Sequence, residues 1–359
     1  MNETERCDRV QAQLAEREVG ALLVSAAANL RYLSGFTDAE ALLVVTTDGE
    51  RCFFTDFRYE IQAEQELPAS FLTVIATDLL PAVAERFGEV GALGVDDDHL
   101  TVAQHRRLGE LLGEGTTRVG CGGLVEKLRV VKDADELERI RAAAALIDGI
   151  YEWVLERGLV GRRERDVALE LEHEMRRRGA RAPSFPSIVA AGAHGALPHA
   201  TPRDVAIEPD TLVTIDIGAE LDGYCSDCTR TFASGTLGAE EARIYEVTLQ
   251  AQLAGLEAVR AGRSGRVVDA AAREVIEQAG YGERFGHGLG HGVGLEVHER
   301  PRLSRTAPED PLEPGMVVTV EPGIYLPGVT GVRIEDLVVV GEEGCERLSH
   351  FPKELIVAG

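Results

Sequence analysis

The chain has 359 residues, of which 37 are basic and 61 are acidic, so its formal net charge at pH 7 is −24. This acidic balance argues against a nucleic-acid partner, because phosphate binding needs clustered Lys and Arg side chains. A chain of this length is expected to form two α/β domains rather than one small core.

The sequence lacks the features of a membrane-spanning or secreted protein, which indicates the cellular compartment. It contains no run of about 18 apolar residues, which predicts that no helix spans a membrane. Residues 1–5 are polar and acidic and lack the basic start of a signal peptide, so we expect a cytoplasmic location. Four of the six cysteines are widely scattered, as expected for small apolar filler in a reducing compartment: Cys7, Cys52, Cys121 and Cys345.

Residues 1–127 alternate helical and strand patterns at short intervals, which predicts an α/β domain with a sheet between helices. Helices are predicted at residues 3–18, 58–65, 79–87 and 102–112. Strands are predicted at residues 21–24, 41–46, 52–55, 71–75 and 92–95. Nothing in this domain has the pattern of a reaction centre.

A second domain is predicted over residues 128–359. Asp133, with Glu136 three residues later, has the pattern of a helix cap with its capping partner and opens a long Ala-rich helix to about residue 155. Further helices are predicted at residues 164–178, 239–259 and 266–278. Strands are predicted at residues 187–191, 212–217, 230–233, 317–321 and 336–340.

The second domain contains a short internal sequence repeat. Residues 211–218 and 316–323 are both apolar strands that deliver a carboxylate, Asp216 or Glu321, shortly before a glycine. Each strand follows a turn that contains proline. We therefore expect two similar half-domains that bring their carboxylates together.

Five residues form a candidate metal site, at the ends of predicted strands or in a Gly-rich turn: Asp216, Asp227, His291, Glu321 and Glu335. Carboxylates repel one another, so clustering four of them without a cation is unfavourable. Oxygen ligands with one imidazole favour two divalent metals over a structural zinc. Two such metals can share one water and lower its pKa.

Asp227 lies inside a C-x-x-C pair formed by Cys225 and Cys228. Such a pair is either a redox dithiol or two thiols packed behind the strand, and the absence of a second pair argues against a four-cysteine zinc site. The segment at residues 286–294 reads G-H-G-L-G-H-G-V-G. Its glycines allow close backbone approach beside His287 and His291, and His298 follows nearby.

These residues carry a resemblance to a known family. The phrases are PH at 198–199, DIG at 216–218, YCSDCTRTF at 224–232, GHGVGLEVHE at 290–299, EPGIY at 321–325 and RIED at 333–336. They resemble the proline-specific pita-bread metallopeptidases, prolidase (Xaa-Pro dipeptidase) and Xaa-Pro aminopeptidase, over the whole second domain. Residues 29–36 more loosely resemble the creatinase/prolidase N-terminal domain. The resemblance implies an α/β (α+β) fold, with a creatinase-like N-terminal domain and a pita-bread catalytic domain of two pseudo-twofold half-domains.

The resemblance implies a hydrolase that removes an N-terminal residue preceding proline, with two Mn, Co or Zn ions held by the five residues above. Glu321 would be the general base. His199 and His298 would stabilise the transition state and pass a proton to the proline nitrogen. His287 would line the proline pocket, and Arg333 and Tyr325 would also be substrate-binding residues. Arg333 and Thr229 would in addition orient the carboxylates. A homodimer is also implied.

Whether the enzyme is a dipeptidase depends on a group that grips the free carboxylate of the proline. Arg302 and Arg305 are the candidates, and they favour Xaa-Pro dipeptides as substrates. The alternative is an Xaa-Pro aminopeptidase acting on longer peptides, and a remote one is a non-catalytic binding module on the same fold. His194 stands where the family usually has Asn, so it is either a pocket residue or merely exposed.

Overall fold

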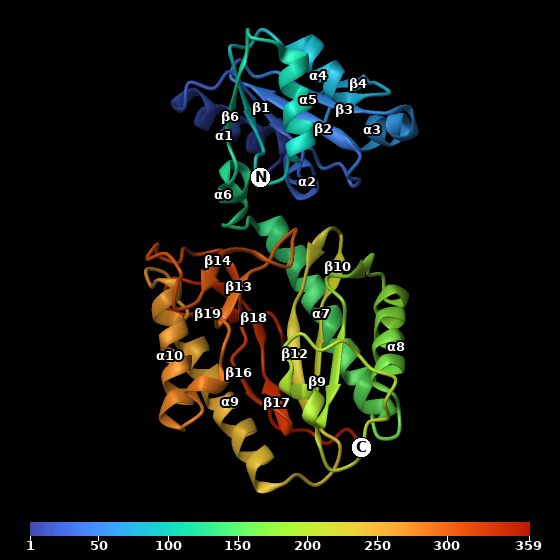
Figure 1. Ribbon diagram of the computed structural model, residues 1–359, viewed down its shortest axis with the longest axis vertical. Helices are drawn as coiled ribbons and strands as arrows, with labels where there is room; N and C mark the ends of the chain where they lie inside the picture. Colours follow the sequence, from blue (N-terminus) through green and yellow to red (C-terminus); the bar gives the residue numbers. More distant parts are fainter. The chain divides into compact units, whose positions relative to one another are not determined.

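The computed structural model describes residues 1–359 and divides them into two compact units, Met1–Arg129 and Val130–Gly359 (Figure 1). The boundary predicted between residues 127 and 128 falls inside helix α6 (Leu124–Arg129), shortly before this division. No helix is both long and apolar enough to cross a membrane.

The first unit is one six-stranded sheet in the order β4-β3-β2-β1-β5-β6. Its strands are β1 (Ala21–Val24), β2 (Ala41–Thr46), β3 (Arg51–Thr55), β4 (Leu72–Ile75), β5 (Ala92–Val95) and β6 (Thr117–Gly120). Its other helices are α1 (Glu3–Glu16), α2 (Ala27–Ser34), α3 (Glu60–Glu66), α4 (Leu79–Phe87) and α5 (Val102–Leu112). Strand β1 pairs antiparallel with β2 and parallel with β5, so the sheet is mixed. The predicted strands all form, whereas α2, α6 and β6 lay outside the predicted elements.

Four long helices define the second unit: α7 (Ala134–Arg157), α8 (Glu164–Arg177), α9 (Ala239–Ala258) and α10 (Gly265–Gln278). The predicted capping box of α7 is confirmed. The Asp133 side chain accepts from the Glu136 backbone N–H at 3.0 Å, and the Glu136 side chain accepts from the Asp133 N–H at 3.0 Å. These bonds satisfy amide groups that the first helical turn otherwise leaves without partners.

The strands of the second unit fall into two halves, and in Figure 1 α8 stands at one side of the view, α9 and α10 stand at the other, and α7 runs behind the strands of the first half. The first half contains β7 (Ala182–Pro183), β8 (Ile188–Ala191), β9 (Leu212–Ile217), β10 (Ala219–Leu221), β11 (Tyr224–Cys225) and β12 (Cys228–Ala233). The second contains β13 (Gly290–Gly292), β14 (Glu299–Leu303), β15 (Val317–Val320), β16 (Gly323–Leu326), β17 (Thr330–Arg333), β18 (Asp336–Val340) and β19 (Cys345–Arg347).

Each half has its own buried core, because each pair of helices covers its own strands. Ile147 and Tyr151 of α7 pack with Ile215 of β9 in the first half. Ile244 of α9 and Ala272 of α10 pack with strands β15 and β18 in the second.

The two halves repeat one antiparallel strand pair. β9 pairs with β12, and β15 pairs with β18. In an antiparallel pair the end of the first strand lies beside the start of the second. Asp216 near the end of β9 therefore lies close to Asp227, just before β12, and Glu321 after β15 lies close to Glu335, just before β18. The internal repeat in the sequence corresponds to this repeated strand pair.

We predict that Tyr151→Phe destabilises the second unit. Tyr151 is fully buried, and its hydroxyl donates towards the carbonyls of Ile215 at 3.0 Å and Cys228 at 2.7 Å, which ties α7 to β9 and β12. Its loss should lower the free energy of unfolding by about 1–2 kcal/mol. Urea unfolding followed by the fluorescence of Trp153, the single tryptophan, measures this change.

Tyr281→Phe is the matched control, because its hydroxyl contacts Glu240 at an exposed position. Its effect should stay within about 0.5 kcal/mol. Equal effects of the two substitutions would show that the buried hydroxyl does not tie α7 to the strands.

Candidate metal centre

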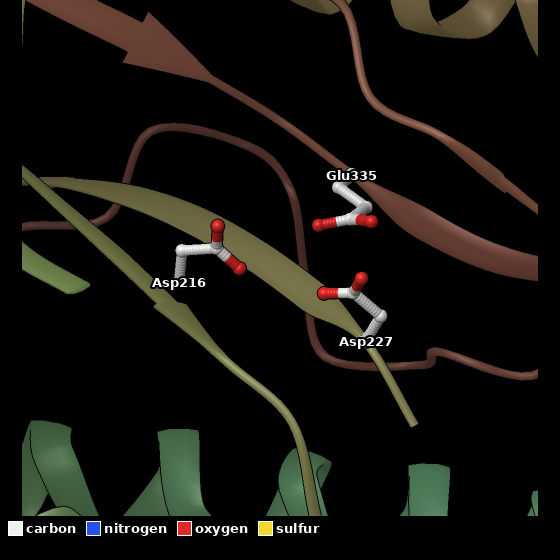
Figure 2. Close-up of side chains that lie close together, drawn as sticks. All are labelled: Asp216, Asp227 and Glu335. Atoms are coloured by element: carbon white, nitrogen blue, oxygen red, sulfur yellow. The ribbon is translucent and has the colours of Figure 1, made fainter. Parts of the chain in front are cut away.

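Three carboxylates meet between the two halves of the second unit. Oxygen atoms of Asp216, Asp227 and Glu335 all lie within 4.8 Å of one another, and all three residues are buried. Figure 2 shows their carboxyl groups turned towards a common space. The sequence predicted this meeting, and the strand pairings described above produce it.

The cluster carries more negative charge than the protein around it compensates. Burial and the neighbouring carboxylates raise the pKa of Asp227 and of Glu335 well above the usual range. Burial also raises the pKa of Asp216, although the Arg333 guanidinium opposes this. Groups that resist ionisation in this way need a counter-charge to stay ionised at neutral pH.

In two of these carboxylates, one oxygen accepts a hydrogen bond that orients the group, and the other oxygen has no partner. Asp216 Oδ2 accepts from Arg333 Nη2 at 2.6 Å, and Glu335 Oε2 accepts from Thr229 Oγ1 at 2.8 Å. Asp216 Oδ1 and Glu335 Oε1 are buried without a hydrogen bond. Because an unsatisfied buried oxygen is costly, these atoms fit the role of cation ligands.

His291 is oriented in the same manner. Its Nδ1 lies 3.1 Å from the Gly292 carbonyl, which can only accept, so Nδ1 carries a proton and Nε2 can take either a second proton or a cation. Nε2 lies 3.6 Å from Asp227 Oδ2 and 3.2 Å from Glu321 Oε1. Two acceptors this close need a proton or a cation between them, so a divalent cation fits here as well.

Glu321 is anchored by Thr319, which is fully buried. Thr319 Oγ1 donates to Glu321 Oε1 at 3.0 Å and accepts from the His291 backbone N–H at 3.0 Å. Burial alone would raise the pKa of Glu321, but the hydrogen bond and charge of His291 outweigh it and lower the pKa to about 2. Glu321 is therefore held ionised beside His291.

Arg333 connects the cluster to a wider hydrogen-bond network. Besides Asp216, its guanidinium contacts Thr229 Oγ1 at 3.0 Å and the Tyr325 hydroxyl at 3.0 Å, and the residue is only 4% exposed. Arg333 and Tyr325 were predicted to bind substrate. The structure places Arg333 behind the carboxylates, where it orients them.

The hydrogen bonds of His287 define its tautomer. Nδ1 lies 2.7 Å from the Gly288 carbonyl and must donate to it, so Nε2 accepts from the Tyr325 hydroxyl at 2.9 Å. The ring also packs edge-on against Phe285, with the centroids 5.0 Å apart. His287 thus has both nitrogens engaged and presents ring carbon to its surroundings.

His298, His199 and Arg302 gather beside the cluster. The rings of His298 and His291 are 4.3 Å apart. His298 is exposed, but partial desolvation lowers its pKa, and the nearby charges of His291, Arg302 and His199 lower it further against the opposing charge of Glu321. Arg302 is the register partner of His291 in the β13–β14 pair, so both side chains leave the same face. Arg305 is exposed beyond the end of β14.

His194 is neither exposed nor placed among the ligands. It lies in the short helix η2 (Gly192–Ala196), is buried, and its Nδ1 is 2.9 Å from Glu164 Oε2. Sequence reasoning missed Glu164, because it stands among the arginines of residues 162–165 and has the pattern of a solvated helix start. Its exposure is only 1%, which no local sequence signal indicates.

The Cys225 and Cys228 thiols are free, buried and directed to different partners. Cys225 Sγ contacts the Leu295 carbonyl at 3.8 Å, and Cys228 Sγ contacts the Glu335 carbonyl at 3.5 Å. Burial raises the pKa of both thiols, which keeps them protonated. This environment favours packing behind the site over redox chemistry.

Comparison with known proteins matches both units of the chain. Residues 138–342 match metallopeptidase family M24, and residues 6–131 match the creatinase/prolidase N-terminal domain. The Xaa-Pro dipeptidase of Pyrococcus furiosus is 34% identical, over 98% of this chain and 99% of its own length.

Two solved structures are similar to the whole chain. The Xaa-Pro dipeptidase of Bacillus anthracis superposes with a TM-score of 0.95 at 40% identity, covering 99% of this chain and 100% of its own. The X-Pro aminopeptidase of Thermotoga maritima superposes with a TM-score of 0.88 at 35% identity, covering 96% and 99%.

We predict that divalent cations stabilise the chelator-treated protein. A cation present at 100 times its dissociation constant should raise the free energy of unfolding by about 2.7 kcal/mol. Glu335→Gln should remove most of this gain, because it deletes a buried ligand oxygen while an acceptor for Thr229 remains. Differential scanning calorimetry with and without Mn²⁺, Co²⁺ or Zn²⁺ measures the effect.

The control is Asp148→Asn, since this carboxylate caps the backbone N–H groups of His350 and Phe351 instead of joining the cluster. It should keep the full cation-dependent gain. An unchanged gain in Glu335→Gln would place the cation elsewhere.

We predict a defined pH dependence for Glu164. Burial opposes its ionisation, but hydrogen bonds from Arg203 and Ala191 outweigh burial and lower its pKa below the ordinary 4.5. A carboxyl with a lowered folded-state pKa stabilises above its unfolded-state pKa and loses that contribution as the pH falls through the folded-state value. The stability lost in Glu164→Gln should therefore be constant above pH 4.5 and shrink below it. Urea midpoints over a pH series measure the difference, and growth of the difference towards low pH would contradict the expectation.

Proposed function

The chain belongs to metallopeptidase family M24, and from this premise we propose that it is an Xaa-Pro dipeptidase that uses two divalent cations. The observation that carries the proposal is the buried carboxylate cluster with its two unpartnered oxygens, next to His291, whose neighbours are His298 and Arg302. Relatives named Xaa-Pro dipeptidase match the chain along nearly its whole length, which supports the same substrate class.

The charge of the cluster supports two cations. Four ionised carboxylates carry a charge of −4, of which Arg333 offsets one, so a single divalent cation would leave the cluster negative. We propose Asp216, Asp227, His291, Glu321 and Glu335 as the ligands, with Mn, Co or Zn as the metal. Oxygen donors with one imidazole nitrogen suit each of these ions. The homodimer and the cytoplasmic location stay predictions from the resemblance and from the N-terminal residues.

Bound divalent cations supply an electrophile for the scissile carbonyl and lower the pKa of a water to about 7. Glu321, held ionised by Thr319 and His291, accepts the proton of the attacking water. We assign to His298, whose ring lies 4.3 Å from that of His291, and to His199 the hydrogen bonds to the carbonyl oxygen as its charge develops. The proton that Glu321 accepted then passes to the proline nitrogen through one of these histidines as the bond breaks, which leaves Glu321 ionised again.

His287 suits the ring of proline for a physical reason. Its two nitrogens are already engaged by Gly288 and Tyr325, so it offers an apolar ring surface to a bound substrate. Phe285 packs against the same imidazole. A pyrrolidine ring, which has no donor once it is part of an Xaa-Pro bond, fits such a surface.

Arg302 is the residue that we assign to the free carboxylate of the substrate. Its register with His291 directs it to the face of the site, and its charge acts on His298. A guanidinium there binds a carboxylate through paired hydrogen bonds. Xaa-Pro aminopeptidase activity on longer peptides is the second candidate, supported by the similar Thermotoga structure. The five intact candidate ligands argue against a non-catalytic binding module.

We predict that Arg302→Ala separates these candidates. The substitution should raise KM for an Xaa-Pro dipeptide about 10- to 100-fold, because a charge-assisted hydrogen bond is lost, and should affect an Xaa-Pro-Yaa tripeptide less. Arg305→Ala is the matched control and should leave both substrates nearly unchanged. Product analysis on peptides of increasing length, before and after chelation and metal re-addition, measures the outcome.

Cleavage of the tripeptide as fast as the dipeptide, with no effect of either arginine, would identify an aminopeptidase. Hydrolysis that survives complete metal removal would contradict the proposed mechanism.

A further inference from the structure

The connection between β8 and β9 carries His199, and a single buried carboxylate from α8 holds both ends of its first part, residues 191–203, called the loop below. Glu164 stands in the first turn of α8 and is 1% exposed. Its carboxylate accepts hydrogen bonds from three residues of the segment 191–203: Ala191, His194 and Arg203.

The start of the loop is held by two bonds. Ala191 donates its backbone N–H to Glu164 Oε1 at 2.9 Å, and His194 Nδ1 contacts Glu164 Oε2 at 2.9 Å. Because an ionised carboxylate can only accept, Nδ1 of His194 is the donor.

The end of the loop is held by Arg203 through three bonds. Its backbone N–H and Nε each donate to Glu164 Oε2 at 3.0 Å, and Nη2 donates to Oε1 at 2.9 Å. The guanidinium therefore makes a bidentate contact, which is geometrically specific. One carboxylate closes a loop of about a dozen residues.

The middle of the loop is supported by Arg333 and by the packing of η2 on β17, where Gly195 lies against Gly331. It is also supported by Ala200, which is buried with Ile188 and Ala190. Arg333 Nη1 donates to the Pro198 carbonyl at 3.3 Å, and Arg333 also holds Asp216. Beyond these contacts the tip is open to solvent: Leu197 is 57% exposed and His199 is exposed. The side chain of His199 projects from this exposed tip, so its position depends on these contacts together with the closure at the base of the loop.

We propose that Glu164 is a positioning residue that sets His199 against the metal centre by closing the loop of residues 191–203. The inference rests on the proposed function, in which His199 contacts the substrate. Displacing a reacting group by about 1 Å can cost on the order of 100-fold in rate. Glu164 acts through the loop and touches neither substrate nor cation.

A double-mutant cycle with a Xaa-Pro dipeptide tests the proposal. Glu164→Gln keeps the shape of the side chain but turns an amide N–H₂ towards the donors of Arg203, which loosens the loop. We expect kcat to fall about 10- to 100-fold while the calorimetric affinity for Mn²⁺ stays unchanged. In the His199→Ala background, where the positioned imidazole is absent, adding Glu164→Gln should lower kcat almost no further.

An activity-independent measurement separates this inference from the proposed function. Hydrogen–deuterium exchange should rise in residues 192–203 of Glu164→Gln and remain unchanged around β15 and β18. Asp148→Asn, which removes a comparable carboxylate cap from another loop, should leave both kcat and this exchange unchanged. Arg203→Met is the milder variant if Glu164→Gln fails to fold, and its smaller loss of kcat should also vanish in the His199→Ala background.

A full effect of Glu164→Gln on top of His199→Ala, or unchanged exchange in the loop, would overturn the positioning role. If the wild-type protein cleaves no Xaa-Pro peptide, the proposed function fails, and the exchange experiment alone then decides whether Glu164 closes the loop.

Discussion

Mutual repulsion among buried carboxylates is the constraint on which the second unit depends. Asp216, Asp227 and Glu335 are brought within 4.8 Å by strand pairings that the core stabilises independently. Hydrophobic burial in each half provides the free energy that holds like charges together. The protein supplies only part of the compensating charge, through Arg333, and leaves the remainder to a cation.

Arg333 and Thr229 show how the two halves share this task. Thr229 comes from β12 in the first half and donates to Glu335 of the second, while Arg333 comes from β17 in the second and donates to Asp216 of the first. The two residues also contact each other at 3.0 Å. Each half therefore orients a carboxylate that the other half provides, and a displacement of one half would disturb both carboxylates at once.

The parts of this molecule that were predictable are those whose signal is local. Asp216 and Glu321 each end an apolar strand shortly before a glycine, and the resemblance that they carry is confirmed by the family match. Strands β13, β14, β16 and β17 went unpredicted because they are short and contain Gly or Pro, so no alternation develops. The choice between Arg302 and Arg305 needs the register of β14, which shifts at an irregularity between His291 and Gly292. Glu164 was unpredictable, because its burial arises from a loop that returns about thirty residues later in the chain.

The distribution of the candidate ligands along the chain has a consequence for biogenesis. The first, Asp216, and the last, Glu335, are separated by the whole of α9, α10 and the Gly-rich segment. Domains fold from the N-terminus as the ribosome proceeds, so the first half can form its strands while its carboxylates still face solvent. A nascent chain cannot bring all five candidate cation ligands together until β18 has been translated. Hydrolytic competence would then arise only at the end of synthesis, and a truncated chain would lack it even if its N-terminal unit had folded.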